Sequence, residues 1–222
     1  MSTTKSLPVA IRLVLATIIV MLALLVLVGG WTIPFTFESS SILYKFGLEK
    51  TYLRSGKVIG ISAAILLFFQ LFPASRFTVL EQVFSIKSLG SLHRINGMTI
   101  TILVLSHPLL IKASENFTPY TFEKKYYPEF LGMALLAVLL VLAVTAMFRN
   151  FLKLSHAGWL QLHRLSATLA LVLLPAHILY VSETFKSGIP RKAALVIFCL
   201  NLLMISRVWL RGLLQKKISS RS

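Results

Sequence analysis

The chain has 222 residues, of which 56% are hydrophobic, and its mean hydropathy is +0.81. This composition excludes an ordinary water-soluble domain. The formal net charge of +16 suggests a nucleic-acid-binding protein at first sight, but the basic residues lie mostly beside apolar runs, as membrane topology signals do.

Apolar runs of about 20 residues recur along the chain, and each can cross a hydrocarbon core about 30 Å thick. They predict six transmembrane helices, at residues 9–33, 55–73, 91–113, 128–149, 158–181 and 192–212. Backbone polar groups must be satisfied within the fold inside lipid, so we expect an all-α, six-helix bundle. These helices leave no room for a folded soluble unit, which predicts one membrane domain over residues 1–222 without a flavin or nucleotide domain.

The first apolar run resembles a signal peptide because Lys5 and Arg12 precede it. The stretch from Leu13 to Gly30 is longer than a signal core of roughly 7–15 residues, and no A-x-A-like site follows it. We therefore expect a retained first helix.

Two aromatic-rich loops are expected on the outer side of the membrane. The first runs from Pro34 to Arg54, and the second, from Ser114 to Tyr127, carries Phe117, Tyr120, Phe122, Tyr126 and Tyr127. Such loops either cover an acceptor pocket or form the aromatic belt common at membrane interfaces.

Basic residues are more frequent on the side that holds both termini. With flanking helix ends counted, that side has 13 basic residues and the opposite side has 10. The larger set is Lys5, Arg12, Arg76, Lys87, Arg94, Arg149, Lys153, Arg164, Arg207, Arg211, Lys216, Lys217 and Arg221. The bias predicts that both termini of this multi-pass protein lie in the cytoplasm. The membrane itself is expected to be a bacterial inner membrane. The basic face suits anionic lipid head groups or an acidic redox partner.

Four histidines lie in the third and fifth predicted helices. His93 and His107 are 14 residues apart, and His163 and His177 repeat that spacing at an offset of 70 residues. Fourteen residues are four helical turns, so each pair lies on one side of its helix, about 21 Å apart along the axis. The two helices cross the membrane in the same direction, which places His93 level with His163 near the cytoplasm and His107 level with His177 near the outer side.

Facing imidazoles at one depth suit haem, whose iron takes one axial ligand from each side of the ring. We therefore expect the inner pair His93/His163 and the outer pair His107/His177 to ligate two haems b. Arg94 and Arg164 follow the inner histidines and either pair with haem propionates or extend toward the lipid head groups.

Three further features leave alternatives open. Gly97 and Ala167, one turn after the inner histidines, and Ala170 allow either close approach of a haem or ordinary small-residue helix packing. His156 is either a polar interfacial residue or has a redox or ligand role. The single cysteine, Cys199, is expected to be a packing residue.

Other functional classes find little support. Soluble catalytic motifs such as G-x-G-x-x-G, the P-loop and C-x-x-C do not occur, and the absence of Asp argues against a proton-relay pump. A metal-ion transporter would need carboxylates, Met or Cys beside the histidines, and a haem-free structural subunit would leave their register unexplained.

The chain resembles the ferric reductase-like transmembrane domain family, which includes ferric reductases, NADPH oxidases and MsrQ-type membrane subunits. The similarity is carried by Arg54-Ser55-Gly56, by the helix from His93 to His107, and by Trp159-x-x-Leu162-His163 followed by Pro175-x-His177. It implies a haem b cytochrome with the ligand pairs described above. His93 favours the two-haem members, because MsrQ-like proteins usually lack that inner histidine.

The resemblance implies an oxidoreductase component that carries electrons to an acceptor at the outer face, such as ferric iron or oxygen. Ferric reductases and oxidases continue into flavin and nucleotide domains. We therefore expect this chain either to rely on a separate cytosolic flavoprotein or reductase that supplies FAD or FMN, or to be a fragment of a larger reductase. The alternative is an MsrQ-like subunit that passes electrons from quinone or flavin to a periplasmic oxidoreductase.

Overall fold

The structure is a computed structural model that describes residues 7–38, 46–75 and 77–219, with side chains up to Gly212. Within these residues the chain forms helices and no strand. Six helical segments are long and apolar enough to cross a membrane, which confirms the predicted number and the all-α fold class.

The long helices are α1 (Val9–Thr36), α2 (Gly47–Phe69), α5 (Ile86–Ser114), α6 (Tyr127–Met147), α7 (His156–Val181) and α8 (Gly188–Ser219). Short elements between them are α3 (Leu71–Ser75), α4 (Thr78–Val83), η2 (Lys124–Tyr126) and η3 (Glu183–Phe185). We call the end of the bundle where α1, α5 and α7 begin the terminal face, and the other end the opposite face.

Several helices extend beyond their predicted ends. The second begins at Gly47 instead of residue 55, and the third begins at Ile86 instead of residue 91. The apolar runs mark only the lipid-crossing part, whereas a polar turn continues a helix into the interface. Ser85 illustrates this, because its side chain accepts a hydrogen bond from the Ser88 backbone N–H and so caps the start of α5.

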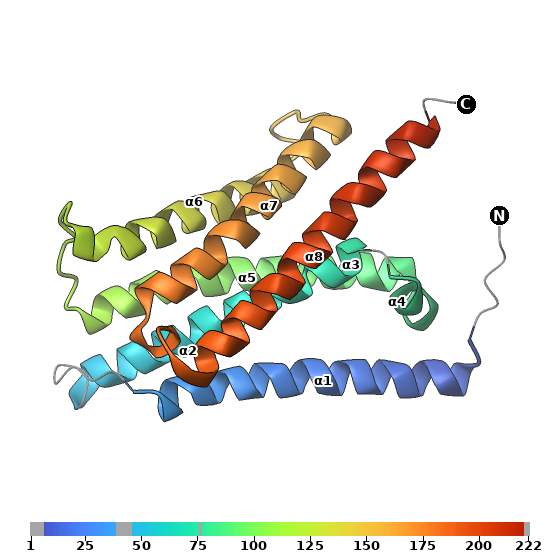
Figure 1. The fold of residues 1–222 in the computed structure, drawn as a ribbon. Helices are drawn as coiled ribbons and strands as arrows, with labels where there is room; N and C mark the ends of the chain where they lie inside the picture. Colours follow the sequence, from blue (N-terminus) through green and yellow to red (C-terminus); the bar gives the residue numbers. More distant parts are fainter. Residues whose placement is uncertain (1–6, 39–45, 76, 220–222) are drawn as a thin grey trace.

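Two close helix pairs form the body of the bundle (Figure 1). One pair is α2 with α5, and the other is α6 with α7. Helix α1 packs on α2, and α8 packs on α7 and α3. Within the described residues, α5 and α7 are not a closely packed pair, although they carry the four histidines.

The apolar core is small, since most large apolar side chains face outward, as expected for a protein dissolved in lipid. One buried cluster joins Leu71, Leu171 and Met204, from α3, α7 and α8. Another joins Leu135 and Leu139 of α6 to the fully buried Ala170 of α7. Together these clusters fix α7 between its neighbours and thereby set the position of its histidines.

Some sequence-based expectations fall on residues that the structure does not describe. Lys5, Arg76 and Arg221 of the basic set lie outside the described residues, as do residues 39–45 of the first aromatic loop. The second aromatic loop is described. Phe122 is 93% exposed and stacks on Phe130, and the Tyr120 ring lies 5.1 Å from that of Tyr126. These contacts fit both a belt and a cover over the opposite face.

Candidate functional site

The four histidines form two facing pairs. The ring centroids of His93 and His163 are 6.2 Å apart, and those of His107 and His177 are 6.5 Å apart. Each pair joins α5 to α7, and the two members of each pair are the ones expected from the helix directions. The two levels are separated by the 14-residue spacing, about 21 Å along a helix.

The ring distances suit two imidazoles on opposite sides of one metal ion. With metal–nitrogen bonds of about 2 Å and each nitrogen about 1 Å from its ring centre, the centroids would be about 6 Å apart. Among the described residues no group of three or more His, Cys, Asp or Glu side chains could hold a metal ion by itself. A pair of imidazoles suits a metal whose other ligands come from a cofactor, as in haem.

Backbone hydrogen bonds orient the outer pair. His107 Nδ1 lies 2.8 Å from the Gly56 carbonyl oxygen of α2, and His177 Nδ1 lies 3.3 Å from the Pro128 carbonyl oxygen of α6. A carbonyl oxygen can only accept, so Nδ1 must carry the hydrogen in both contacts. The neutral ring then keeps its lone pair on Nε2, the state that a metal-binding histidine needs.

The inner pair has a different environment. The Nδ1 atoms of His93 and His163 are buried and have no hydrogen-bond partner. Buried polar atoms without a partner are uncommon and need an explanation. A metal ion bound directly at Nδ1 would satisfy this atom, so the inner pair also fits a cofactor site.

Three residues that support the histidines were not predicted from the sequence. Gly60 lies against His107, Gly132 lies against His177, and the Gln70 side-chain amide donates a hydrogen bond to the His93 backbone carbonyl at 2.8 Å. The motifs offered no indication of these roles, because each contact joins helices that are distant in sequence. Knowledge of which helices pack together would have identified them.

The structure distinguishes the two explanations for the small residues. A Cβ added at Gly97 would meet Gln70 Nε2 at 3.2 Å, so the group that approaches Gly97 is a neighbouring side chain. Ala170 packs against Leu135 and Leu139. Both contacts favour helix packing over contact with a haem.

Arg94 and Arg164 are exposed at the terminal face, where the sequence places them beside the inner pair. Neither guanidinium forms an ion pair with a described carboxylate. Extension toward lipid head groups and pairing with an anionic cofactor group both agree with this placement.

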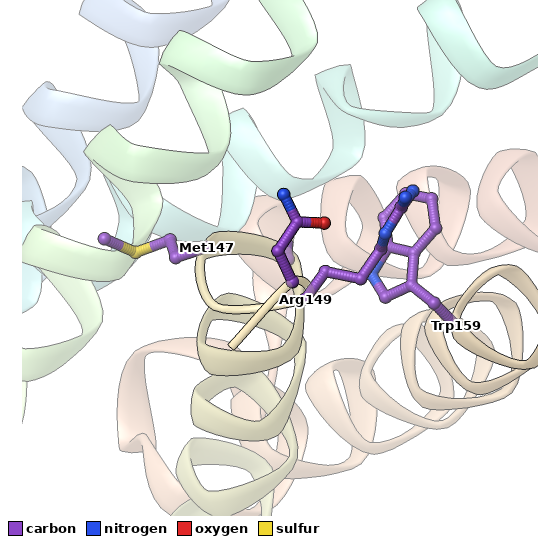
Figure 2. Close-up of a pocket in the computed structure, with 5 residues that line it drawn as sticks. Met147, Arg149 and Trp159 are labelled. Carbon is purple, nitrogen blue, oxygen red and sulfur yellow. The ribbon is translucent and has the colours of Figure 1, made fainter. Parts of the chain in front are cut away.

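A polar hollow of about 340 Å³ opens beside α7 at the terminal face, lined by Ala146, Met147, Arg149, Asn150 and Trp159 (Figure 2). Arg149 Nη1 lies 3.1 Å from His156 Nδ1, and the Arg149 guanidinium carbon lies 5.6 Å from the Trp159 ring centroid. The Trp159 ring in turn lies 5.4 Å from that of His163. His156 thus belongs to a polar and aromatic group that leads from the surface to the inner pair.

Fold and site together define a class: a six-helix membrane protein with two levels of facing histidines between two of its helices. Residues 59–174, just over half of the chain, match the family model for the ferric reductase like transmembrane component. The chain belongs to this family, and it is a component of membrane electron transfer. Comparisons with curated proteins and with solved structures found no match.

The matched segment contains His93, His107 and His163, and His177 follows three residues after its end. The family generally binds haem. Family membership was therefore predicted correctly from the sequence, and the facing rings are where a cofactor of this type would need its ligands.

Proposed function

We propose that the chain is a b-type cytochrome that carries electrons across the membrane between two haem sites. The observation that carries the proposal is the pair of ring distances, 6.2 Å and 6.5 Å, at two depths of the same two helices. His93 and His163 would hold the inner haem, and His107 and His177 the outer one. Haem held there by one imidazole from α5 and one from α7 would supply a one-electron carrier, which suits electron transfer.

The protein's own residues position the two sites. The buried contacts of α7 with α6 and α8 hold His163 and His177 in line, and α2 holds α5 through Gln70 and Gly56. The histidines remain uncharged because a protonated imidazole is costly within a bilayer and cannot ligate a metal.

We infer that electrons enter at the terminal face and leave at the opposite face. The larger number of basic residues at the terminal face supports a cytoplasmic position for it. A separate flavoprotein or reductase would supply the electron there, next to Trp159, whose ring contacts that of His163. Ferric iron, oxygen or a periplasmic protein would accept it at the opposite face.

Spectroscopy of the purified full chain tests the proposal. The protein should be red, show a b-type band after dithionite reduction, and yield about two haems per chain by the pyridine haemochrome assay. Colourless protein expressed with an adequate haem supply would contradict it. One haem per chain would support the MsrQ-like alternative instead.

A further inference from the structure

A common arrangement of carbonyl and glycine recurs at three places in the bundle. A side-chain donor reaches a backbone carbonyl of a helix, and the residue four positions after that carbonyl is glycine. The three cases are His107 at Gly56 with Gly60, His177 at Pro128 with Gly132, and Gln70 at His93 with Gly97.

Helix geometry explains why glycine is needed there. The side chain at position i+4 lies beside the carbonyl of residue i, and several hydroxyl groups of this chain demonstrate it. Thr99, Thr101 and Ser106 each donate a hydrogen bond to the carbonyl four residues earlier. Without a Cβ at i+4, that side of the carbonyl is open to a donor from another helix.

The rings of the outer histidines fill the space beside Gly60 and Gly132. A Cβ at Gly60 would lie 2.7 Å from His107 Nδ1, and a Cβ at Gly132 would lie 2.5 Å from His177 Cε1 and 2.9 Å from its Nδ1. These distances are too short for non-bonded atoms, so either ring would have to move away from its carbonyl. The two glycines lie on different helices, α2 and α6, which makes them independent cases.

We propose that Gly60 and Gly132 are positioning residues for the outer histidine pair. Because these glycines have no Cβ, the imidazole rings can reach the Gly56 and Pro128 carbonyls. The resulting hydrogen bonds keep the hydrogen on Nδ1 and leave the lone pair on Nε2 for a metal. The inner pair has no such hydrogen bonds, since the Nδ1 atoms of His93 and His163 lack a hydrogen-bond partner. The role in haem binding rests on the function proposed above, whereas the effect on the tautomer does not.

The first experiment measures the tautomer in the haem-free full chain. Nitrogen NMR of ¹⁵N-histidine-labelled protein should find the hydrogen of His107 and His177 on Nδ1, with signals assigned by replacing each histidine in turn. Gly60→Ala should change the signal of His107 and leave that of His177, and Gly132→Ala should do the reverse. Gly29→Ala in α1 is the matched control, because an added Cβ there meets no atom within 4 Å.

The second experiment measures haem retention in a His93→Ala background, in which only the outer pair is complete. Loss of a residue that orients a metal ligand typically weakens metal binding about 10–100-fold. Transfer of haem to apomyoglobin should be faster by a similar factor in Gly60→Ala and Gly132→Ala, but not in Gly29→Ala. Circular dichroism should find unchanged helix content, since alanine is a better helix former than glycine.

The two experiments separate the two proposals. Wild-type protein that binds no haem would contradict the proposed function, and the tautomer measurement would still decide the role of the glycines. If Gly60→Ala and Gly132→Ala behave like Gly29→Ala in the tautomer measurement, the positioning role is wrong, even for a protein that binds two haems.

Discussion

At the residue scale, the two histidine pairs differ in what surrounds them more than in their distances. The outer imidazoles are held through Nδ1 by backbone carbonyls, whereas the inner imidazoles have buried Nδ1 atoms without a partner. A metal ligand that is oriented by a second hydrogen bond binds in a defined direction. The outer imidazoles are thus oriented by the polypeptide through Nδ1, whereas the inner imidazoles are not.

Replacing single histidines should remove one haem at a time. His93→Ala or His163→Ala should lower the pyridine haemochrome value from about two haems per chain to about one, because each removes one ligand of a bis-histidine site. His107→Ala should lower it equally. Exposed His156→Ala is the control and should retain both haems; a histidine of either pair that can be replaced without loss would contradict its assignment.

Gln70 should contribute measurably to stability. Gln70→Met keeps the side-chain length but removes the hydrogen bonds to the His93 carbonyl and from Asn96. Hydrogen bonds between membrane helices contribute about 0.6 kcal/mol each on average, so the free energy of unfolding in detergent should fall by about 1 kcal/mol. The exposed Gln161→Met in α7 is the control and should leave it unchanged.

At the element scale, helix α7 carries packing residues and residues of the candidate site on one surface. Trp159 and His163 are four residues apart, hence neighbours on one side of the helix, and their rings lie 5.4 Å apart. Ala170 and Leu171, further along, are buried against α6 and α8. The packing that fixes α7 in the bundle therefore also fixes Trp159 and His163 relative to the terminal face.

Trp159 should matter for electron input. In Trp159→Leu, reduction of the loaded protein by chemically reduced flavin in a stopped-flow spectrometer should slow several-fold, because the aromatic contact to His163 is lost. The haem content should stay unchanged. Trp209→Leu is the control, since Trp209 lies on α8 and donates its hydrogen bond to Thr168; equal rates in wild type and Trp159→Leu would exclude this route.

At the scale of the whole molecule, the asymmetry of charge should decide orientation. The basic residues of the terminal face should be retained on the cytoplasmic side during insertion, because orientation generally follows the Lys and Arg bias of the short loops. The second aromatic loop, at the opposite face, would then lie outside.

Cysteine labelling in whole cells tests that orientation. Cys199 is the one cysteine of the sequence, so Cys199→Ser provides a cysteine-free background. In that background, a membrane-impermeant maleimide should label Glu123→Cys in the second aromatic loop and should not label Lys153→Cys between α6 and α7. The opposite pattern would reverse the direction proposed for electron transfer, and permeabilised cells provide the control for accessibility.

Much of this molecule could be predicted from its sequence. Six apolar runs determine six membrane helices, because a lipid-crossing backbone has to satisfy its own hydrogen bonds. The 14-residue spacing and the 70-residue offset determine which histidines share a depth, because helical rise and direction are regular. Helix ends were less predictable, since a polar turn such as the one at the start of α2 continues the helix outside the apolar run.

Only the tertiary structure decided how the histidines are held. Gly56 and Gly60 look generic in the sequence, yet they become the acceptor and the space for His107 once α2 lies against α5. Gln70 and Gly132 acquire their roles in the same way. The physical reason is that helical periodicity is a local property of the chain, whereas the partner of a buried polar atom depends on which helix packs beside it.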